Sequence, residues 1–172
     1  MNARARAQLA AIGEVHKLLL REGIEHGLFG GWAVDFYASQ VTREHDDVDL
    51  AVWLDDAKRV TTVLARAGFA HAPEPDEDGG TGYERGPVRV ELTFLVRGED
   101  GSARIPLRAG SVPWVERGLE GRELELDGNS CQVIGYAALV RTKSQNRGDS
   151  SDRAKDAADL AQLRRAETDP RS

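Results

Sequence analysis

The sequence contains one cysteine, Cys131, among 172 residues. A lone cysteine rules out an intramolecular disulfide and a cysteine-based zinc site, because both need several thiols in one chain. It leaves a small buried residue or a nucleophile, and burial is the ordinary fate of a free cysteine. We therefore expect Cys131 to lie in the core.

Long apolar runs are also absent. No stretch reaches the ~18 consecutive apolar residues of a membrane-spanning helix. Residues 1–6 carry charge, but the hydrophobic segment of a signal peptide does not follow them. The sequence therefore predicts no membrane span, no signal peptide and a cytoplasmic location.

A basic surplus is missing as well. The 23 Lys and Arg residues are outnumbered by 29 Asp and Glu, for a net charge of -6. Domains that bind nucleic acid usually carry a basic surplus, so we expect no nucleic-acid partner. A small nucleotide needs only a local group of cations and stays compatible with this charge. With 40% hydrophobic and 30% charged residues, the chain resembles an ordinary globular protein of about one domain.

Apolar periodicity and turn residues divide the chain into short helices and strands. Residues 71–82, rich in Pro, Asp and Gly, are expected to form a loop, and residues 111–121 receive no assignment. The mixed order of the elements predicts an α+β fold. Helices are predicted at 6–21, 32–39, 55–68, 136–145 and 151–165, and strands at 26–30, 47–53, 88–96, 104–107, 123–126 and 131–134.

Two aspartates, Asp47 and Asp49, stand in the short apolar run 47–53. Side chains of a strand alternate, so both carboxylates point to one face while Val48 and Leu50 point to the other. Carboxylates held about 7 Å apart on one strand face repel each other unless a cation lies between them. Magnesium prefers such oxygen ligands together with substrate phosphates. The alternative is a solvated strand end with chance acids.

Two further features surround these aspartates. Gly30-Gly31 follows a predicted strand and opens a helix, where glycine allows a phosphate to approach free backbone N–H groups. On its own, such a pair is more often a tight turn. Glu91 projects from the polar face of the predicted strand 88–96, where a lone glutamate is usually solvated. If that strand pairs beside the strand of Asp47 and Asp49, the three carboxylates converge.

Residues 30–50 resemble the signature GGWAxD…TRxHxDxDL of small antibiotic nucleotidyltransferases. These include the aminoglycoside 2″-adenylyltransferases and the lincosamide nucleotidyltransferases, within the polymerase-β-like nucleotidyltransferase superfamily. The resemblance extends more weakly over residues 10–165. The matching segments are Gly30-Gly31-Trp32-Ala33-Val34-Asp35 and Thr42-Arg43-Glu44-His45-Asp46-Asp47-Val48-Asp49-Leu50.

The resemblance implies a mixed β-sheet flanked by helices, with residues 1–110 as the nucleotidyltransferase core and residues 111–172 closing the cleft, unless the two form one continuous domain. It implies that Gly30 and Gly31 contact nucleotide phosphates. Asp47 and Asp49 would hold Mg²⁺, and Glu91 would be a third metal ligand, the general base, or both. The implied reaction moves a nucleoside monophosphate from an NTP, with ATP favoured, to a hydroxyl of a small molecule, with pyrophosphate released.

An aminoglycoside or lincosamide acceptor is the first expectation, which would make the reaction one of antibiotic resistance. Two alternatives stay open: transfer to a hydroxyl of a partner protein, and a nucleotide-binding module that has lost catalysis. The run Glu91-Leu92-Thr93 departs from the family, whose members usually carry aspartate, a hydrophobic residue and histidine there. The chain is expected to act as a monomer or a homodimer.

Three more residues are candidates for the site. Arg43 would hold phosphate, or else form an ion pair with Asp35. Lys143 would reach the triphosphate, or else be a solvated helix charge. Asp156 shares a helix face with Asp159 and would contact a cationic acceptor, or else pair with neighbouring basic residues.

Overall fold

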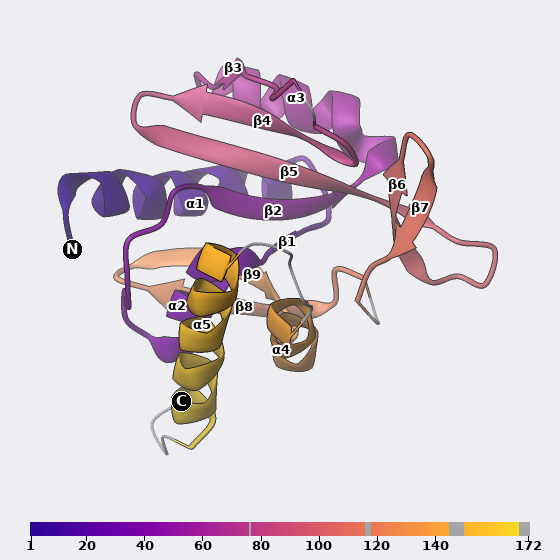
Figure 1. Cartoon of the computed structure of the whole chain (residues 1–172). Helices are drawn as coiled ribbons and strands as arrows, with labels where there is room; N and C mark the ends of the chain where they lie inside the picture. The colour runs from indigo at the N-terminus through magenta and orange to yellow at the C-terminus, as the bar shows by residue number, and fades with distance from the viewer. Residues whose placement is uncertain (76, 116–117, 145–149, 169–172) are drawn as a thin grey trace.

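The computed structural model describes residues 1–75, 77–115, 118–144 and 150–168. These residues form five α-helices, one short 3-10 helix and nine strands (Figure 1). The helices are α1 (Ala3–Arg21), α2 (Gly30–Ala38), η1 (Leu54–Asp56), α3 (Ala57–Arg66), α4 (Tyr136–Ser144) and α5 (Ser150–Thr168). The strands are β1 (His26–Leu28), β2 (Val48–Trp53), β3 (Ala70–His71), β4 (Gly80–Arg85), β5 (Val88–Arg97), β6 (Ala103–Leu107), β7 (Gly110–Pro113), β8 (Gly121–Leu126) and β9 (Asn129–Ile134).

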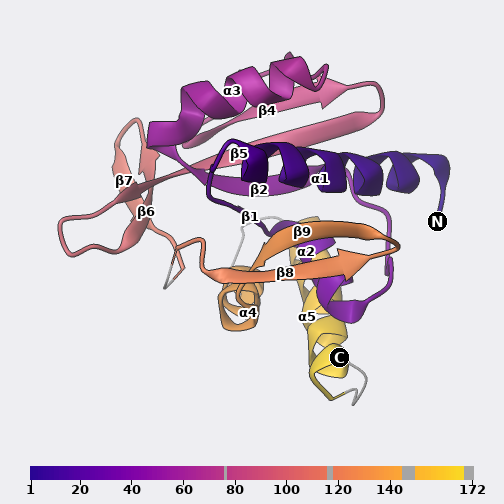
Figure 2. The ribbon, with the colours of Figure 1, turned by 180° about the vertical axis from the view of Figure 1, so that it is seen from behind.

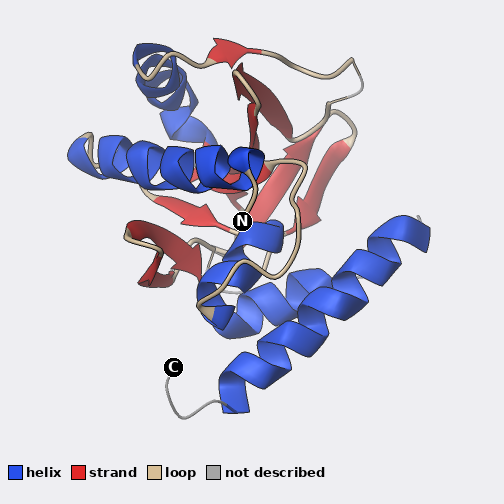
Figure 3. Cartoon of the chain, turned by 90° about the vertical axis from the view of Figure 1, so that its left-hand side faces the viewer, coloured by secondary structure: helices blue, strands red, loops and turns tan. Residues whose placement is uncertain are grey.

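The strands form one mixed sheet in the order β3-β4-β5-β2-β1-β9-β8, which confirms the predicted α+β class. The hairpin of β6 and β7 continues from the end of β5. Helices α1 and α3 lie on the same side of the sheet, as the view from behind shows (Figure 2). Helices α4 and α5 pack together with α2 at the end of the molecule near β8 and β9 (Figure 3).

Helix α1 follows from its apolar stripe. Leu9, Ile12 and Val15 are spaced three residues apart and are at most 2% exposed, which is the pattern of a helix that buries one face. The side chain of Asn2 accepts a hydrogen bond from the backbone N–H of Ala5 and caps the first turn. Gly23, with φ of +65°, turns the chain away after the last helical residue.

The pairing of β2 with β5 sets the centre of the sheet. The two strands run parallel, and Val48 lies opposite Val90, Asp49 opposite Glu91 and Leu50 opposite Leu92. The valines and leucines of these pairs are at most 2% exposed, so they belong to the core. The alternating pattern of the sequence therefore predicted the faces correctly for β2 and for residues 88–92 of β5, but was wrong at the end of β5, where Leu95 is 1% exposed while Phe94 and Val96 are half-buried.

Two stretches of the sequence analysis were wrong or incomplete. The predicted loop 71–82 contains the end of β3 and the start of β4, and residues 111–121 contain most of β7. Strand β4 carries Gly80 and Gly82, at which a Cβ atom would meet the backbone carbonyls of Leu92 and Ala72. Glycine is therefore needed there for close packing of the strand, although its propensity alone indicates a loop.

Residues 111–172 share the sheet of the N-terminal residues, because β9 pairs in parallel with β1. The proposed boundary at residue 110 thus separates two segments that lie in one continuous sheet. Cys131 on β9 is free and buried, as expected, and burial raises the pKa of its thiol above the ordinary value. Among the helices described, none has both the length and the apolar character needed to span a bilayer.

Candidate active site

The three predicted carboxylates meet where β2 begins. Asp49 lies directly opposite Glu91 in the parallel register, and Asp47 is placed one residue before β2. One oxygen atom of each of Asp47, Asp49 and Glu91 lies within 4.8 Å of the others. All three side chains are half-buried. The structure therefore brings the acids together, and their binding of a metal ion stays a prediction.

The acidic cluster leaves Asp47 in an unfavourable field. Burial, followed by the negative charges of Glu91 and Asp46, raises the pKa of Asp47 above its ordinary value. A raised pKa means that the native state binds this proton more tightly than the unfolded state does. The free energy of unfolding therefore falls as the pH rises from the ordinary aspartate pKa to the raised one, and at neutral pH the ionised group costs stability.

Asp47→Asn should therefore stabilise the metal-free protein. We expect a gain of about 1 kcal/mol at neutral pH, of the size seen when strained functional groups are replaced. For a chain of this length this raises the thermal midpoint by about 2–4 °C. The gain should shrink as the pH is lowered toward the pKa of Asp47, because the wild-type carboxyl then becomes neutral.

The control for this measurement is Asp127→Asn. Asp127 is exposed in a turn with φ of +46°, a conformation that asparagine also adopts readily. Calorimetry of both variants without divalent ions should show a higher midpoint for Asp47→Asn alone. An unchanged or lower midpoint would contradict the assigned repulsion.

Gly30 and Gly31 are required by the packing of the site. Gly30 has φ of +71°, and a Cβ atom there would overlap the carboxylate of Asp49. A Cβ atom at Gly31 would collide with His45 and with the guanidinium of Arg43. Both glycines open α2, whose N-cap residue Phe29 makes no side-chain capping bond. The first N–H groups of α2 are therefore suited to an anion, and the phosphate contact stays a prediction.

Arg43 and Lys143 both contact Asp159, which lies on α5. Arg43 Nε and Nη2 lie 3.1 and 3.0 Å from the two carboxylate oxygens of Asp159. Lys143 Nζ lies 2.8 Å from Asp159 and 3.1 Å from Asp156. The alternative prediction that Arg43 pairs with Asp35 is thus wrong, because its partner is Asp159. The alternative prediction that Lys143 is a solvated helix charge is also wrong, because Lys143 is 6% exposed.

Asp159 is the anion that holds these cations. Burial opposes its ionisation, but hydrogen bonds from Arg43 and Lys143 outweigh burial and hold the pKa of Asp159 below its ordinary value. The same contact with Asp159 raises the pKa of Arg43 against the effect of burial. Asp156 is 7% exposed, and its role as an acceptor contact stays a prediction.

A second network fixes the segment that leads into Asp47. Asp35 is fully buried and accepts hydrogen bonds from the backbone N–H of Thr42 at 3.0 Å and from its hydroxyl at 2.5 Å. His45 Nε2 lies 2.6 Å from the other oxygen of Asp35, and its ring packs on Trp32 with the centroids 4.7 Å apart. The signature residues between Gly30 and Asp47 therefore position the loop that carries the acids.

Sequence reasoning missed Arg89, which lies two residues before Glu91 on the same strand face. Arg89 Nε donates to Glu91 Oε1 at 2.7 Å, and Nη1 donates to Glu84 at 2.9 Å. The hydrogen bond to Glu91 is the main reason that the pKa of Arg89 is raised. The i,i+2 spacing on one strand was a signal that could have identified this pair.

The acids and the cations line one pocket of about 250 Å³. In this pocket, carboxylates lie beside Lys143 of α4 and Lys155 of α5. The lining residues are Gly30, Gly31, Arg43, His45, Asp46, Asp47, Asp49, Glu91, Lys143, Lys155 and Asp156.

The family model described as aminoglycoside-2''-adenylyltransferase matches residues 11–163. The chain belongs to this family. Membership makes it a nucleotidyltransferase, because nucleotidyl transfer is the reaction the family is named for. No curated protein is a significant match to the sequence of this family member.

Several solved structures are similar to it in fold. ANT(2'')-Ia, in complex with adenylyl-2''-tobramycin, is 17% identical, with 94% of this chain and 93% of that chain covered and a TM-score of 0.71. The lincomycin-bound lincosamide antibiotic adenylyltransferase LnuA is also 17% identical, with 86% and 90% covered and a TM-score of 0.64. An antigenic nucleotidyltransferase-like protein from Paracoccidioides brasiliensis is 17% identical, with 91% and 75% covered and a TM-score of 0.55.

Proposed function

We propose that this family member transfers a nucleoside monophosphate from a nucleoside triphosphate, ATP being our first choice, to a hydroxyl of an aminoglycoside or lincosamide antibiotic. The observation that carries the proposal is the parallel register of β2 and β5, which sets Asp49 opposite Glu91 in a pocket that Arg43 and Lys143 also line. Such a pocket has acids for a metal ion on one side and cations for a polyphosphate on the other.

The acidic cluster suits a hard divalent cation. Its donors are carboxylate oxygens within 4.8 Å of one another, and magnesium takes oxygen ligands while keeping positions for substrate phosphates. We assign Asp47, Asp49 and Glu91 as the residues that would hold Mg²⁺. When bound, the metal would neutralise the triphosphate and stabilise the pyrophosphate leaving group.

The cations are assigned to the phosphates. Lys143 is 6% exposed and is held between Asp156 and Asp159, so its ammonium group keeps one position at the edge of the pocket. Arg43 is held by both oxygens of Asp159 and passes close to Gly31. Charges fixed in this way stabilise a polyphosphate without reorganising when it binds.

Glu91 is assigned to the acceptor or to the metal. Arg89 occupies its Oε1 atom, so Oε2 is the oxygen that we assign to the metal or to the proton of the acceptor hydroxyl. In the transfer, the acceptor oxygen bonds to the α-phosphorus and the bond to pyrophosphate breaks. The acceptor proton moves to Glu91 if this residue is the base.

A cationic acceptor is supported by charge. The net charge is -6, and Asp46 at the mouth of the pocket has a side chain that is 74% exposed. A net negative charge attracts cationic ligands and raises their rate of association, although Asp46 itself pairs with Lys155 at 3.1 Å. ANT(2'')-Ia carries an adenylylated aminoglycoside and LnuA a lincosamide, which makes both acceptor classes the first to test.

The test measures pyrophosphate release with Mg²⁺ over four NTPs and a panel of aminoglycosides and lincosamides. Mass spectrometry should find one acceptor heavier by one nucleoside monophosphate. The same antibiotic without the modified hydroxyl should remain unchanged. Magnesium-dependent nucleotide binding without turnover on any acceptor would contradict the proposal and support a binding module.

A further inference from the structure

Three buried residues that the acidic pocket does not use come together behind β1. His16 lies on α1, His26 on β1 and Cys131 on β9, and they are 4%, 4% and 0% exposed. One ligating atom of each lies within 4.8 Å of the others. His16 and His26 are ten residues apart, but Cys131 comes much later in the chain, so no short spacing motif indicates this cluster.

The two imidazole rings face each other through one nitrogen of each, and the tautomers decide which of these atoms carries a hydrogen. His16 Nδ1 and His26 Nε2 are 2.8 Å apart. The outer nitrogens face acceptors, since His16 Nε2 lies 3.4 Å from a carboxylate oxygen of Glu123 and His26 Nδ1 lies 2.9 Å from the carbonyl of Ile24. The tautomers with hydrogen on both outer nitrogens match these acceptors and leave lone pairs on the inner nitrogens, which is the arrangement that a metal ion needs.

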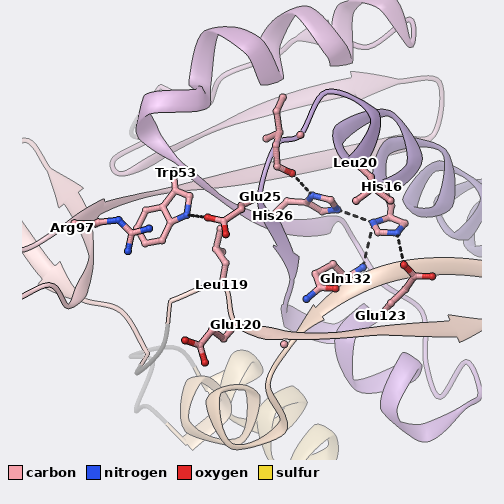
Figure 4. A pocket seen from close by; sticks show the side chains of 13 residues that line it. His16, Leu20, Glu25, His26, Trp53, Arg97, Leu119, Glu120, Glu123 and Gln132 are labelled. Atoms are coloured by element: carbon pink, nitrogen blue, oxygen red, sulfur yellow. Dashed lines mark hydrogen bonds and ion pairs between the residues drawn. The ribbon is translucent and has the colours of Figure 1, made fainter.

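One further contact supports this assignment. The backbone N–H of Gln132 points to His16 Nδ1 at 3.4 Å, so this nitrogen acts as an acceptor. Figure 4 shows His16 and His26 turned toward each other, with Glu123 beyond His16. With hydrogen on both outer nitrogens, the two inner lone pairs face each other and can bind a cation, whereas hydrogen on His16 Nδ1 instead would give an ordinary N–H···N hydrogen bond between the rings.

We propose that His16 Nδ1, His26 Nε2 and Cys131 Sγ form a second metal site for a zinc-type divalent cation. Two histidines and one cysteine are a ligand set that Zn²⁺ binds readily. Ligating histidines almost always donate the other ring N–H to a carboxylate or a carbonyl, and Glu123 and Ile24 supply these acceptors. A shared proton would explain the two rings but not the nearby sulfur.

The site has a path for the ion. A cavity of about 670 Å³ outside the acidic pocket is lined by His16, His26, Glu123 and Gln132, among others. A water molecule from this cavity would be the fourth ligand, and Cys131, which is fully buried and does not line the cavity, would bind the ion from the protein interior. On binding, the thiol of Cys131 loses its proton to solvent as the sulfur–metal bond forms, and the ion replaces any proton between the rings.

A metal ion here would join α1 to β1 and β9. Strand β1 ends at Leu28, and Gly30 of the acidic pocket follows two residues later. The ion would therefore stabilise the strand that leads into the acidic pocket, without taking part in the chemistry of that pocket. A single cysteine excludes only zinc sites built from several cysteines, because here two histidines supply the other two protein ligands.

The experiment titrates the full chain, cleared of metal by a chelator, with Co²⁺. Wild type should develop a sulfur-to-metal charge-transfer band that saturates at one Co²⁺ per chain, while Co²⁺ bound by the acidic pocket gives no such band, and Zn²⁺ should abolish the band and raise the thermal midpoint. Cys131→Ser should lose the charge-transfer band, and His26→Gln should weaken binding at least tenfold. Cys131→Ala serves if the serine variant fails to fold.

Two control variants separate this site from the acidic pocket. His71→Gln, which replaces an exposed histidine on β3, and Asp49→Asn should keep the charge-transfer band and the affinity of wild type. Absence of the band in folded wild type would overturn the proposal and favour a shared proton. Persistence of the band in Cys131→Ser would overturn it as well.

Discussion

Asp49→Asn should lower turnover about a thousandfold, which corresponds to about 4 kcal/mol of transition-state stabilisation. Asp49 lies at the centre of the acidic cluster, opposite Glu91 and against the backbone of Gly30. Asparagine has nearly the same shape as aspartate but no negative charge, so it fills the space beside Gly30 and binds a hard cation poorly. The chemistry should therefore fail while the packing is kept.

The measurement is kcat for nucleotidyl transfer, with circular dichroism and the thermal midpoint as checks of the fold. Asp127→Asn makes the same chemical change in an exposed turn and should leave kcat unaltered. Higher Mg²⁺ concentrations should restore part of the lost rate. If Asp49→Asn kept more than about a tenth of the wild-type rate, less than ~1.4 kcal/mol would be at stake and the metal role would be refuted.

Asp159→Asn should destabilise the protein by about 3–5 kcal/mol, the usual cost of removing one partner from a buried ion pair. Asp159 is 1% exposed and is the shared anion of Arg43 and Lys143. Without it, Lys143 keeps only Asp156 as a partner among the described residues, and Arg43, whose side chain is 26% exposed, loses its carboxylate partner. The thermal midpoint should fall by about 10 °C, at ~2–4 °C per kcal/mol for a chain of this size.

The pH dependence of this loss has a definite sign. The pKa of Asp159 is held below the ordinary aspartate value of 3.8. A lowered pKa gives stability that is fully present above the ordinary value and is lost as the pH falls through the lowered one. The difference between wild type and Asp159→Asn should thus be constant from neutral pH to about pH 5 and shrink at lower pH.

Denaturant unfolding at several pH values tests this, with Asp127→Asn as the exposed control. A loss below about 1 kcal/mol at neutral pH would place Asp159 among surface ion pairs, which contribute little. Such a result would contradict the claim that Asp159 of α5 holds Lys143 and Arg43 in place. Nucleotide affinity, measured on the folded fraction, would then also be expected to stay unchanged.

Much of the fold follows from local patterns. The alternation in residues 88–96 and the stripe of α1 were predicted from spacing, because the repeat of a strand or a helix is a property of the backbone. Strands β3 and β4 were missed, since their pairing is a contact between backbones and Gly80 and Gly82 carry no apolar signal. Their formation depends on β5, which provides the edge on which β4 pairs.

The candidate site divides in the same way. That Asp47 and Asp49 share a face, and that Gly30-Gly31 begins a helix, could be read from adjacent residues, because neighbouring dihedral angles are enough to place them. Glu91 joins them only because β2 and β5, about forty residues apart in the sequence, pair in a parallel register. The sequence analysis could state that pairing only as an assumption.

The partner of Arg43 shows most clearly what packing adds. Arg43 and Asp159 are 116 residues apart, and only the docking of α5 beside α2 brings them into contact. The same docking buries Lys143, which from its helix position alone resembles a solvated charge. Long-range pairs of this kind depend on how whole helices and strands pack. The sequence therefore predicted which residue types could bind phosphate or metal, but only the tertiary structure showed which residues pair with them.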